Sequence, residues 1–252
     1  MQGETLRCAV GRQSVPRRLL PGHRRAAAVL LAACAAIVTG LAVYLAVQGG
    51  PAWPDASLDP WIQAEMGHFP FLLRWLPRVG TLGPVTLMTL ILMAAGAATR
   101  NWLGAVVAGV AEALAVGLTE YVLKPYVGGP IGQAFPSGHA ASMFALAASS
   151  AVLLAEPPHG RSILAFLKFR TVRLLLVLMA LVLAAAVAAA QVAVGAHVFT
   201  DAVGGAAVGV GVVLACALAL DSVTGQAYQA YRARRAPAVE ADSVHSDDER
   251  MA

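Results

Sequence analysis

Long apolar segments alternate with short polar ones along most of this chain. Six of these segments carry almost no charge and are close to the roughly 20 residues that an α-helix needs to cross a bilayer. Their predicted limits are residues 26–48, 82–98, 102–123, 137–155, 174–194 and 202–220. The pattern therefore predicts an all-α fold, an integral membrane bundle of six transmembrane helices.

The segments outside the predicted spans differ in character. Residues 1–25 are polar and basic, and we expect them to form a cytoplasmic N-terminus. Residues 61–78 mix apolar and charged residues, which predicts an interfacial amphipathic helix between the first and second spans. Residues 221–252 are polar with no sustained apolar period, so we expect a cytoplasmic tail that is disordered or weakly helical. The membrane domain is accordingly predicted over residues 26–220.

Basic residues gather on one side of the predicted membrane. Six spans place both termini on the same side, and that side also receives Arg100 and the basic loop 161–173. An excess of Lys and Arg marks the cytoplasmic side of membrane proteins. Both termini are therefore expected in the cytoplasm, whereas the loop 124–135 and the turn 195–201 are expected at the outer face.

The amino-acid composition supports the membrane prediction and narrows the range of possible binding partners. The chain is 58% hydrophobic and 13% charged over 252 residues, and its mean hydropathy is +0.69. The formal net charge of +4 is spread over loops with few aromatic residues nearby, which argues against a nucleic-acid partner. The three cysteines are isolated, so neither a zinc site nor a disulfide framework is predicted. The Ala- and Val-rich composition favours a bacterial plasma membrane.

The string Pro136-Ser137-Gly138-His139 begins the fourth predicted span. Ser137 is suited to cap the helix, and Gly138 lets a ligand approach the backbone. The free N–H groups and the positive dipole end of a helix N-terminus favour phosphate. Lys124, one short loop upstream, adds a full positive charge. These residues predict a phosphate-binding site at the outer face.

A second histidine, His197, precedes the sixth span, and Asp201 follows it by four residues. On a helix this spacing places both side chains on one face. Asp201 could then hold the imidazole in the tautomer that leaves one nitrogen free to attack. Because His139 falls on the same side of the membrane, the two histidines predict a nucleophile and a proton donor that act on a phosphate.

These residues resemble the signatures of the type 2 phosphatidic acid phosphatase superfamily, membrane lipid phosphate phosphatases related in core to vanadium haloperoxidases. The family string Pro-Ser-Gly-His is intact at residues 136–139. The family spacing His-x₃-Asp is present at His197 and Asp201, and Lys124 matches the lysine of the first signature. The resemblance covers about residues 80–220 and includes a six-span layout.

The resemblance implies a role for each matched residue. His197 would attack phosphorus and form a phosphohistidine, Asp201 would orient His197, and His139 would protonate the leaving group. No metal or other cofactor is needed in that mechanism. Three further residues would hold the phosphoryl oxygens, namely Lys124, Ser137 and Gly138.

Two arginines of the family pattern are replaced in this chain. Ile131 stands at the arginine position of the first signature, and Gln191 stands at that of the third. Gln191 can still donate a hydrogen bond, so we count it among the phosphate-binding residues, whereas Ile131 cannot donate one. Losing two charged hydrogen bonds predicts a rate lower by roughly 10²–10⁴. Arg78, on the same predicted side of the membrane, is a candidate replacement.

The sequence thus predicts an enzyme, a metal-independent membrane phosphatase that hydrolyses a lipid phosphate or an isoprenoid (di)phosphate at the outer face. One alternative is a non-catalytic relative that binds an anionic lipid, which the missing arginines motivate. Another is a secondary transporter, for which Glu112 in the third span is the only pointer. The sequence leaves open which lipid phosphate is used and the oligomeric state.

Overall fold

The computed structural model describes residues 19–20, 22–48, 53–127, 135–155 and 165–251, and all regular elements in this part are helical. Short helical turns of other types occur at two places, the π-helix η1 (Leu118–Leu123) and the 3₁₀-helix η2 (Ala165–Lys168). The α-helices are α2 (Arg24–Gln48), α3 (Trp53–Gly67), α4 (Pro70–Val79), α5 (Leu82–Ala98), α6 (Trp102–Gly117), α7 (Lys124–Val127), α8 (Gly138–Leu154), α9 (Arg170–Ala193) and α10 (Phe199–Met251). The prediction of an all-α fold is confirmed.

The structure shows four or five candidate membrane spans rather than the six predicted. Four helical stretches are long and apolar enough to cross a bilayer, and they are Arg24–Val47, Trp102–Val127, Arg170–Ala193 and Phe199–Ala227. A fifth candidate arises if α4 and α5, which meet at a bend of 66°, are taken as one broken span. The helices α5 and α8 have 17 residues each, or about 25 Å, which is less than a hydrocarbon core of about 30 Å.

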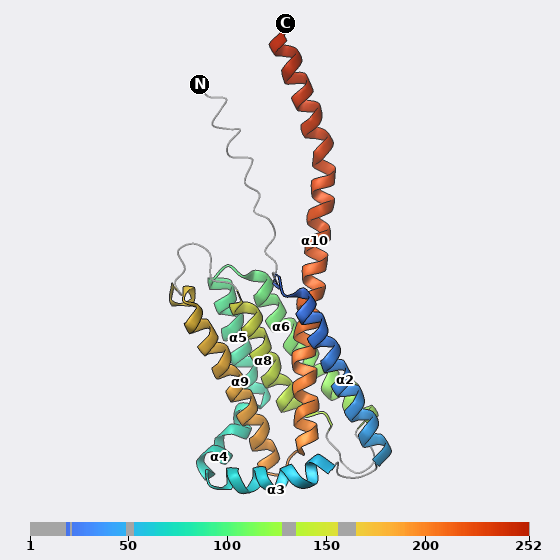
Figure 1. Ribbon diagram of the computed structural model, residues 1–252. Coiled ribbons are helices and arrows are strands. Elements are labelled where there is room, and N and C mark those ends of the chain that lie inside the picture. The colour runs from blue at the N-terminus through green and yellow to red at the C-terminus, as the bar shows by residue number, and fades with distance from the viewer. Residues whose placement is uncertain (1–18, 21, 49–52, 128–134, 156–164, 252) are drawn as a thin grey trace. The chain divides into compact units, whose positions relative to one another are not determined.

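The segment predicted as one interfacial helix is divided into two helices. The predicted helix 61–78 falls on the second half of α3 and on α4, with a break at His68 and Phe69. Phe69 precedes Pro70, and a residue before proline disfavours the helical conformation. Pro70 itself begins α4. An N–H at this position has no partner within the helix, so the missing N–H of proline costs no hydrogen bond there. In Figure 1, α3 and α4 lie across one end of the bundle.

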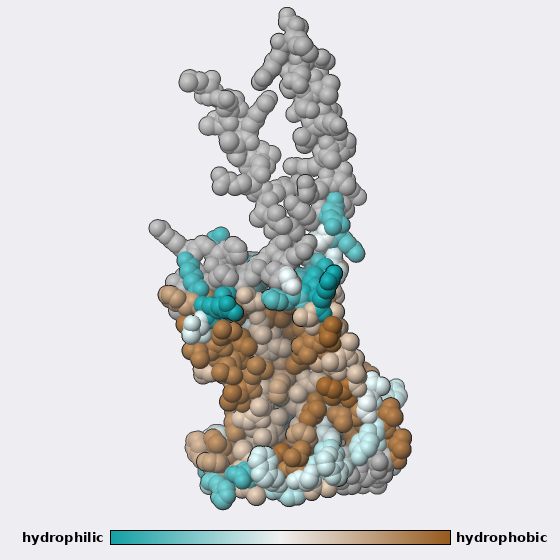
Figure 2. All heavy atoms as spheres, viewed as in Figure 1, coloured by the Kyte–Doolittle hydropathy of each residue, from teal (hydrophilic) through white to brown (hydrophobic). Residues whose placement is uncertain are grey.

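Small side chains fill the interior of the bundle, and large apolar ones cover its outside. The buried positions of α6 include Ala105, Ala108, Ala111 and Ala115, whereas Leu114 on the same helix is exposed. The helix α9 shows the same division between its buried alanines and its exposed leucines. Figure 2 shows the resulting apolar band between more polar ends. This arrangement is typical of helices packed in lipid, where small residues let backbones approach each other.

Two glycines bring α10 into backbone contact with α8. A Cβ on Gly205 would collide with the carbonyl oxygen of Ser137, and a Cβ on Gly209 would lie 2.8 Å from the backbone nitrogen of Ala145. The spacing of these two glycines is that of a GxxxG motif, which permits close helix contact, and the partner is α8. Since backbone atoms cannot move aside as a flexible side chain can, the contact fixes how closely the two helices pack.

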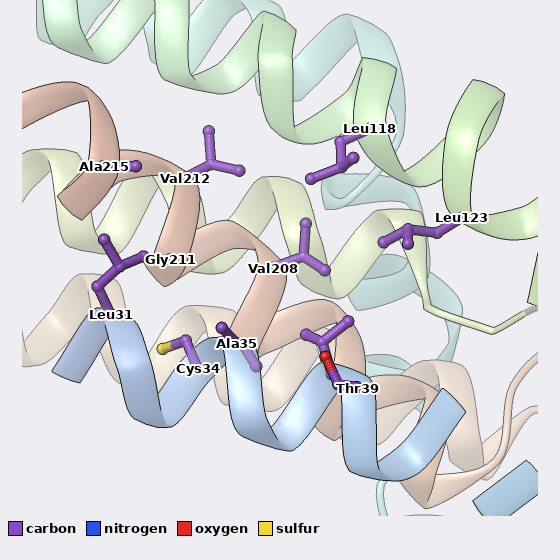
Figure 3. Close-up of a pocket in the computed structure, with 12 residues that line it drawn as sticks. Leu31, Cys34, Ala35, Thr39, Leu118, Leu123, Val208, Gly211, Val212 and Ala215 are labelled. Atoms are coloured by element: carbon purple, nitrogen blue, oxygen red, sulfur yellow. The ribbon is translucent and has the colours of Figure 1, made fainter. Parts of the chain in front are cut away.

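The helix α2 covers α10 less tightly. An apolar pocket of about 330 Å³ lies between α2, η1 and α10. Figure 3 shows Cys34 and Ala35 of α2 beside the segment of α10 that carries Val208 and Gly211, with Leu118 and Leu123 of η1 on the other side of α10. Only 11% of the apolar window of α2 is buried in the described structure. The helix α2 is therefore the most lipid-exposed of the four long spans.

Contacts divide the chain into two units. Residues 19–218 form one unit, which contains the bundle, and residues 219–252 belong to the other together with residues 1–18. The helix α10 continues to Met251 through the segment predicted as a disordered or weakly helical tail. The predicted domain limits at residues 25 and 220 stay predictions.

Substituting Gly209 with Ala is expected to destabilise the bundle by about 1–3 kcal/mol, because the new Cβ would meet the backbone of α8. Gly40→Ala on α2 is the matched control, since a Cβ at Gly40 would meet open space. This control is expected to be neutral or stabilising by about 0.5–1 kcal/mol. Thermal unfolding in detergent measures both, and equal midpoints for the two variants would contradict the described contact.

Candidate functional site

The N-terminus of α8 is fixed to the start of α10 by a backbone hydrogen bond. The Ser137 N–H donates to the carbonyl oxygen of Asp201 at 2.9 Å. Ser137 is the N-cap of α8, with an extended backbone, and its Oγ accepts the Ala140 N–H at 3.4 Å. Ser137 is also almost fully buried, at 1% exposure. The predicted cap therefore forms, and it lies beside the helix that carries Asp201.

Gly138 opens a space that charged side chains occupy. A Cβ at Gly138 would collide with the carboxylate of Glu120 and would lie 3.7 Å from the Nζ of Lys124. Lys124 and Glu120 form an ion pair at 2.5 Å. The structure thus brings Lys124 to the start of α8, as the sequence predicted. It also places the Glu120 carboxylate between Lys124 and Gly138.

A π-helical turn precedes Lys124 directly. The residues of η1 continue α6 with wider turns before α7 begins at Lys124. Wider turns change the direction in which the following side chains point, and such turns are frequent at functional sites. No signal in the sequence indicated this turn, because its residues fit a regular helix equally well.

His197 and Asp201 are in contact. The Nδ1 of His197 lies 3.3 Å from Oδ2 of Asp201, and both side chains are more than nine-tenths buried. The same Oδ2 accepts the N–H of Val198 at 3.4 Å, which holds the carboxylate against the first turn of α10. With Nδ1 bound to the carboxylate, Nε2 of His197 is left to react.

The second histidine lies next to the first. The ring centroids of His139 and His197 are 6.2 Å apart, with an interplanar angle of 62°. The end of α4 closes this side of the site, since a Cβ on Gly80 would lie 2.9 Å from Cδ2 of His139. The two imidazole rings are therefore neighbours at one site.

Gln191 supports the turn that carries His197. Its backbone carbonyl accepts the N–H of Ala196 at 3.0 Å and that of His197 at 3.3 Å. Its side-chain Nε2 donates to the carbonyl oxygen of Pro77 in α4 at 3.5 Å. The amide of Gln191 is thus buried near the site, with one N–H directed to α4. Ile131, at the other arginine position, lies outside the described residues.

Arg78 points toward its own helix. Its Nη1 donates to the carbonyl oxygen of Arg74 at 3.1 Å, and its guanidinium carbon lies 5.2 Å from the centre of the Trp75 ring. The side chain is exposed. These contacts do not favour Arg78 as the replacement for a missing family arginine.

Two carboxylates that sequence reasoning did not assign bind the first turn of α10. Asp55 of α3 accepts the Thr200 N–H at 2.8 Å and the Thr200 hydroxyl at 2.9 Å. Asp59, one turn later, accepts the Phe199 N–H at 2.9 Å. The signal in the sequence was their spacing of four, which places both on one face of a helix. The sequence did not indicate that these two carboxylates bind Phe199 and Thr200 of α10.

Burial raises the pKa of the Asp59 carboxyl above its ordinary value. The Phe199 N–H opposes this shift, and the nearby carboxylates of Asp55 and Asp201 add to it. Three carboxylates therefore surround the N-terminus of α10, which compensates its positive end.

Glu112 lies away from these residues, in the middle of α6. Its carboxyl is buried with no hydrogen bond of normal geometry in the described structure, although Ser142 of α8 interacts with it. It lines a cavity of about 520 Å³ between α5 and α6, together with Thr89 and Tyr121. A buried carboxyl is usually hydrogen-bonded within a bundle, and the geometry here does not provide that bond.

The described residues contain no group of three or more His, Cys, Asp or Glu side chains placed to hold a metal ion. They do bring together two imidazoles, a carboxylate that contacts one of these imidazoles, a capped helix N-terminus and a lysine. This set can attack a phosphorus atom, hold its oxygens and deliver a proton. The arrangement agrees with the sequence-based prediction of which residues lie together, and their individual roles stay predictions.

The comparison with known families agrees with the resemblance seen in the sequence. Residues 124–223 match the family described as the PAP2 superfamily. The match begins at Lys124 and includes every residue predicted for the site, whereas Asp55 and Asp59 lie outside it. No curated protein and no solved structure shows significant similarity to the chain. Members of this superfamily are typically metal-independent phosphatases, and the part of this chain that is similar to them is the PAP2 superfamily domain over residues 124–223.

Proposed function

We propose that this protein hydrolyses a lipid phosphate or an isoprenoid (di)phosphate through a phosphohistidine on His197, at the outer face of the membrane. The observation that carries the proposal is the contact between His197 and Asp201, with the His139 ring 6.2 Å away. A buried imidazole held by a carboxylate is suited to act as a nucleophile. A second imidazole beside it is suited to transfer protons.

The first step forms a bond between Nε2 of His197 and phosphorus. The bond between phosphorus and the leaving oxygen breaks, and His139 donates a proton to that oxygen. The carboxylate of Asp201 stabilises the charge that develops on the His197 ring through its contact with Nδ1. Asp201 keeps its role without becoming protonated.

The second step releases phosphate. His139, now neutral, accepts a proton from water as the water oxygen attacks phosphorus. The bond between phosphorus and Nε2 breaks, and its electron pair returns to the His197 ring. The enzyme is then restored, with His139 protonated for the next cycle.

The helix α8 provides the phosphate site in this proposal. The positive dipole end of this helix favours an anion, and phosphoryl oxygens would take the place beside Gly138 that the Glu120 carboxylate holds in the structure. Lys124 adds a positive charge at the same place. The N-terminus of α10 is less suited to an anion, because Asp55, Asp59 and Asp201 already bind its first turn.

The proposed membrane arrangement keeps six spans. The 17-residue helices α5 and α8 would cross together with the four longer ones, because local thinning of the bilayer accommodates short helices. Both termini would then be cytoplasmic, following the basic residues. The apolar outside of the bundle suits a substrate whose hydrocarbon tail stays in lipid.

We expect His197→Ala to abolish phosphate release and His139→Ala to lower kcat by about 10²–10⁴, the range typical of a lost general acid or base. The measurement is phosphate release by purified protein in detergent, with chelator present, over a panel that contains phosphatidic acid, phosphatidylglycerol phosphate and polyprenyl diphosphate. The preferred lipid would name the substrate class.

His68→Ala is the matched control, because His68 is an exposed histidine between α3 and α4. It is expected to keep wild-type activity. Activity that survives in His197→Ala, with the protein folded, would refute the phosphohistidine mechanism.

Lys124→Met is expected to weaken phosphate binding, and the loss of one charged hydrogen bond of about 1.5–3 kcal/mol corresponds to roughly 10- to 100-fold in kcat/KM. Arg78→Ala is the matched control for a positive charge on the same side, and it is expected to change kcat/KM less than about twofold. A large loss in Arg78→Ala would show that this guanidinium reaches the substrate after all.

The second candidate function is that of a non-catalytic relative that binds an anionic lipid. The observation in its favour is that Gln191 stands at a family arginine position and directs an amide N–H to Pro77. Lipid phosphate binding without phosphate release from any member of the panel would favour this function over hydrolysis.

A further inference from the structure

We propose that Asp55 and Asp59 of α3 are positioning residues for the His197–Asp201 pair. The proposal rests on the proposed function, because a positioning residue has meaning only where a reaction occurs. Neither residue belongs to the matched domain over residues 124–223. The helix α3 would thus complete the site from outside that domain.

Hydrogen bonds between distant parts of the chain carry the proposal. Asp55 receives both the N–H and the hydroxyl of Thr200, at 2.8 and 2.9 Å, across 145 residues of sequence. Asp59 receives the Phe199 N–H at 2.9 Å. Asp55 is 2% exposed, so its bonds are shielded from water and are correspondingly strong.

These bonds fix the segment that connects the two proposed catalytic groups. Phe199 and Thr200 lie between His197 and Asp201, and Asp201 is the next residue after Thr200. The Asp201 carboxylate contacts His197, and its carbonyl oxygen accepts the Ser137 N–H. A rotation of the first turn of α10 would therefore disturb the histidine contact and the bond to α8 together.

The ionised state of Asp59 is unfavourable to folding. Burial raises the pKa of Asp59, the Phe199 N–H of α10 lowers it in part, and the negative charges of Asp55 on α3 and Asp201 on α10 raise it further. A raised carboxyl pKa means that the folded state favours the protonated form. The charge on Asp59 therefore lowers the stability of the fold at neutral pH, and this destabilisation disappears as the pH falls below the pKa of Asp59 in the unfolded chain. Asp59→Asn, which keeps an oxygen acceptor and has no charge, should then be at least as stable as wild type at pH 7.

The alternative role is that the two carboxylates only attach α3 to the bundle. In that case, activity should follow the stability of each variant. A positioning role predicts a different result, in which activity follows the presence of an acceptor oxygen opposite Phe199 and Thr200.

The test compares Asp55→Ala and Asp59→Ala, which remove the acceptor, with Asp55→Asn and Asp59→Asn, which keep one. We expect the alanine variants to lose about 10- to 100-fold in kcat with little change in KM, because Lys124 and the start of α8 still hold the phosphate. The asparagine variants should recover most of kcat. Glu65→Ala removes an exposed carboxylate from the same helix and should leave activity unchanged.

Amide exchange measured by mass spectrometry gives a readout independent of activity. The peptide that contains residues 197–203 should exchange faster in Asp55→Ala and Asp59→Ala than in wild type or Glu65→Ala, since its first N–H groups lose their acceptors. Thermal midpoints are measured in parallel to compare activity with stability.

The outcomes separate this proposal from the proposed function. Unchanged exchange or unchanged kcat in the alanine variants of an active protein would overturn the positioning role alone. Equal losses in the alanine and asparagine variants, in proportion to lost stability, would overturn it as well. A wild-type protein that hydrolyses no member of the lipid panel would overturn the proposed function, and the positioning role with it.

Discussion

One backbone hydrogen bond joins the two parts of the candidate site, from the Ser137 N–H of α8 to the Asp201 carbonyl of α10. It requires the two helices to approach until backbone atoms meet, and the glycines Gly205 and Gly209 allow this approach. The same contact sets the distance between His139, on the first turn of α8, and His197, which precedes α10. A bundle of small buried residues thus determines the geometry of the chemical groups at its end.

The two helix N-termini at the site have different surroundings. The Lys124–Glu120 ion pair lies beside Gly138 at the start of α8, whereas three carboxylates surround the start of α10. A helix end with a lysine beside it is better suited to an anion than one that three carboxylates surround. This difference favours the start of α8 as the phosphate site. It also keeps negative charge close to the His197 ring, which would become positive when it is phosphorylated.

Local patterns in the sequence predicted much of the helical fold and which residues of the candidate site lie together. Apolar length located each helix of the bundle, and Pro-Ser-Gly-His and His-x₃-Asp located residues that the structure brings together. The same reasoning predicted six spans where four or five helical stretches qualify, because α5 and α8 are short and apolar length alone does not define their ends. It also missed the break before Pro70, although a proline after an aromatic residue was visible in the sequence.

The contacts that sequence reasoning missed depend on tertiary structure. Asp55 and Asp59 lie in the short segment between the first predicted span and the predicted interfacial helix, and only the fold shows that they bind Phe199 and Thr200. The π-helical turn before Lys124 has no characteristic sequence. The hydrogen bond from the Gln191 side chain to the Pro77 carbonyl oxygen depends on the packing of α9 against α4. Each of these features joins residues that are far apart in the chain or depends on how a helix is wound.

A search for the covalent phosphohistidine intermediate tests the proposed mechanism most directly. Purified protein would be mixed with the preferred lipid phosphate, quenched within milliseconds under alkaline conditions that preserve phosphohistidine, digested and examined by mass spectrometry. We predict a phosphoryl group on His197 that is absent from His197→Ala and disappears when substrate is exhausted. A phosphoryl group on another residue, or turnover with no labelled residue at any time, would contradict the phosphohistidine mechanism.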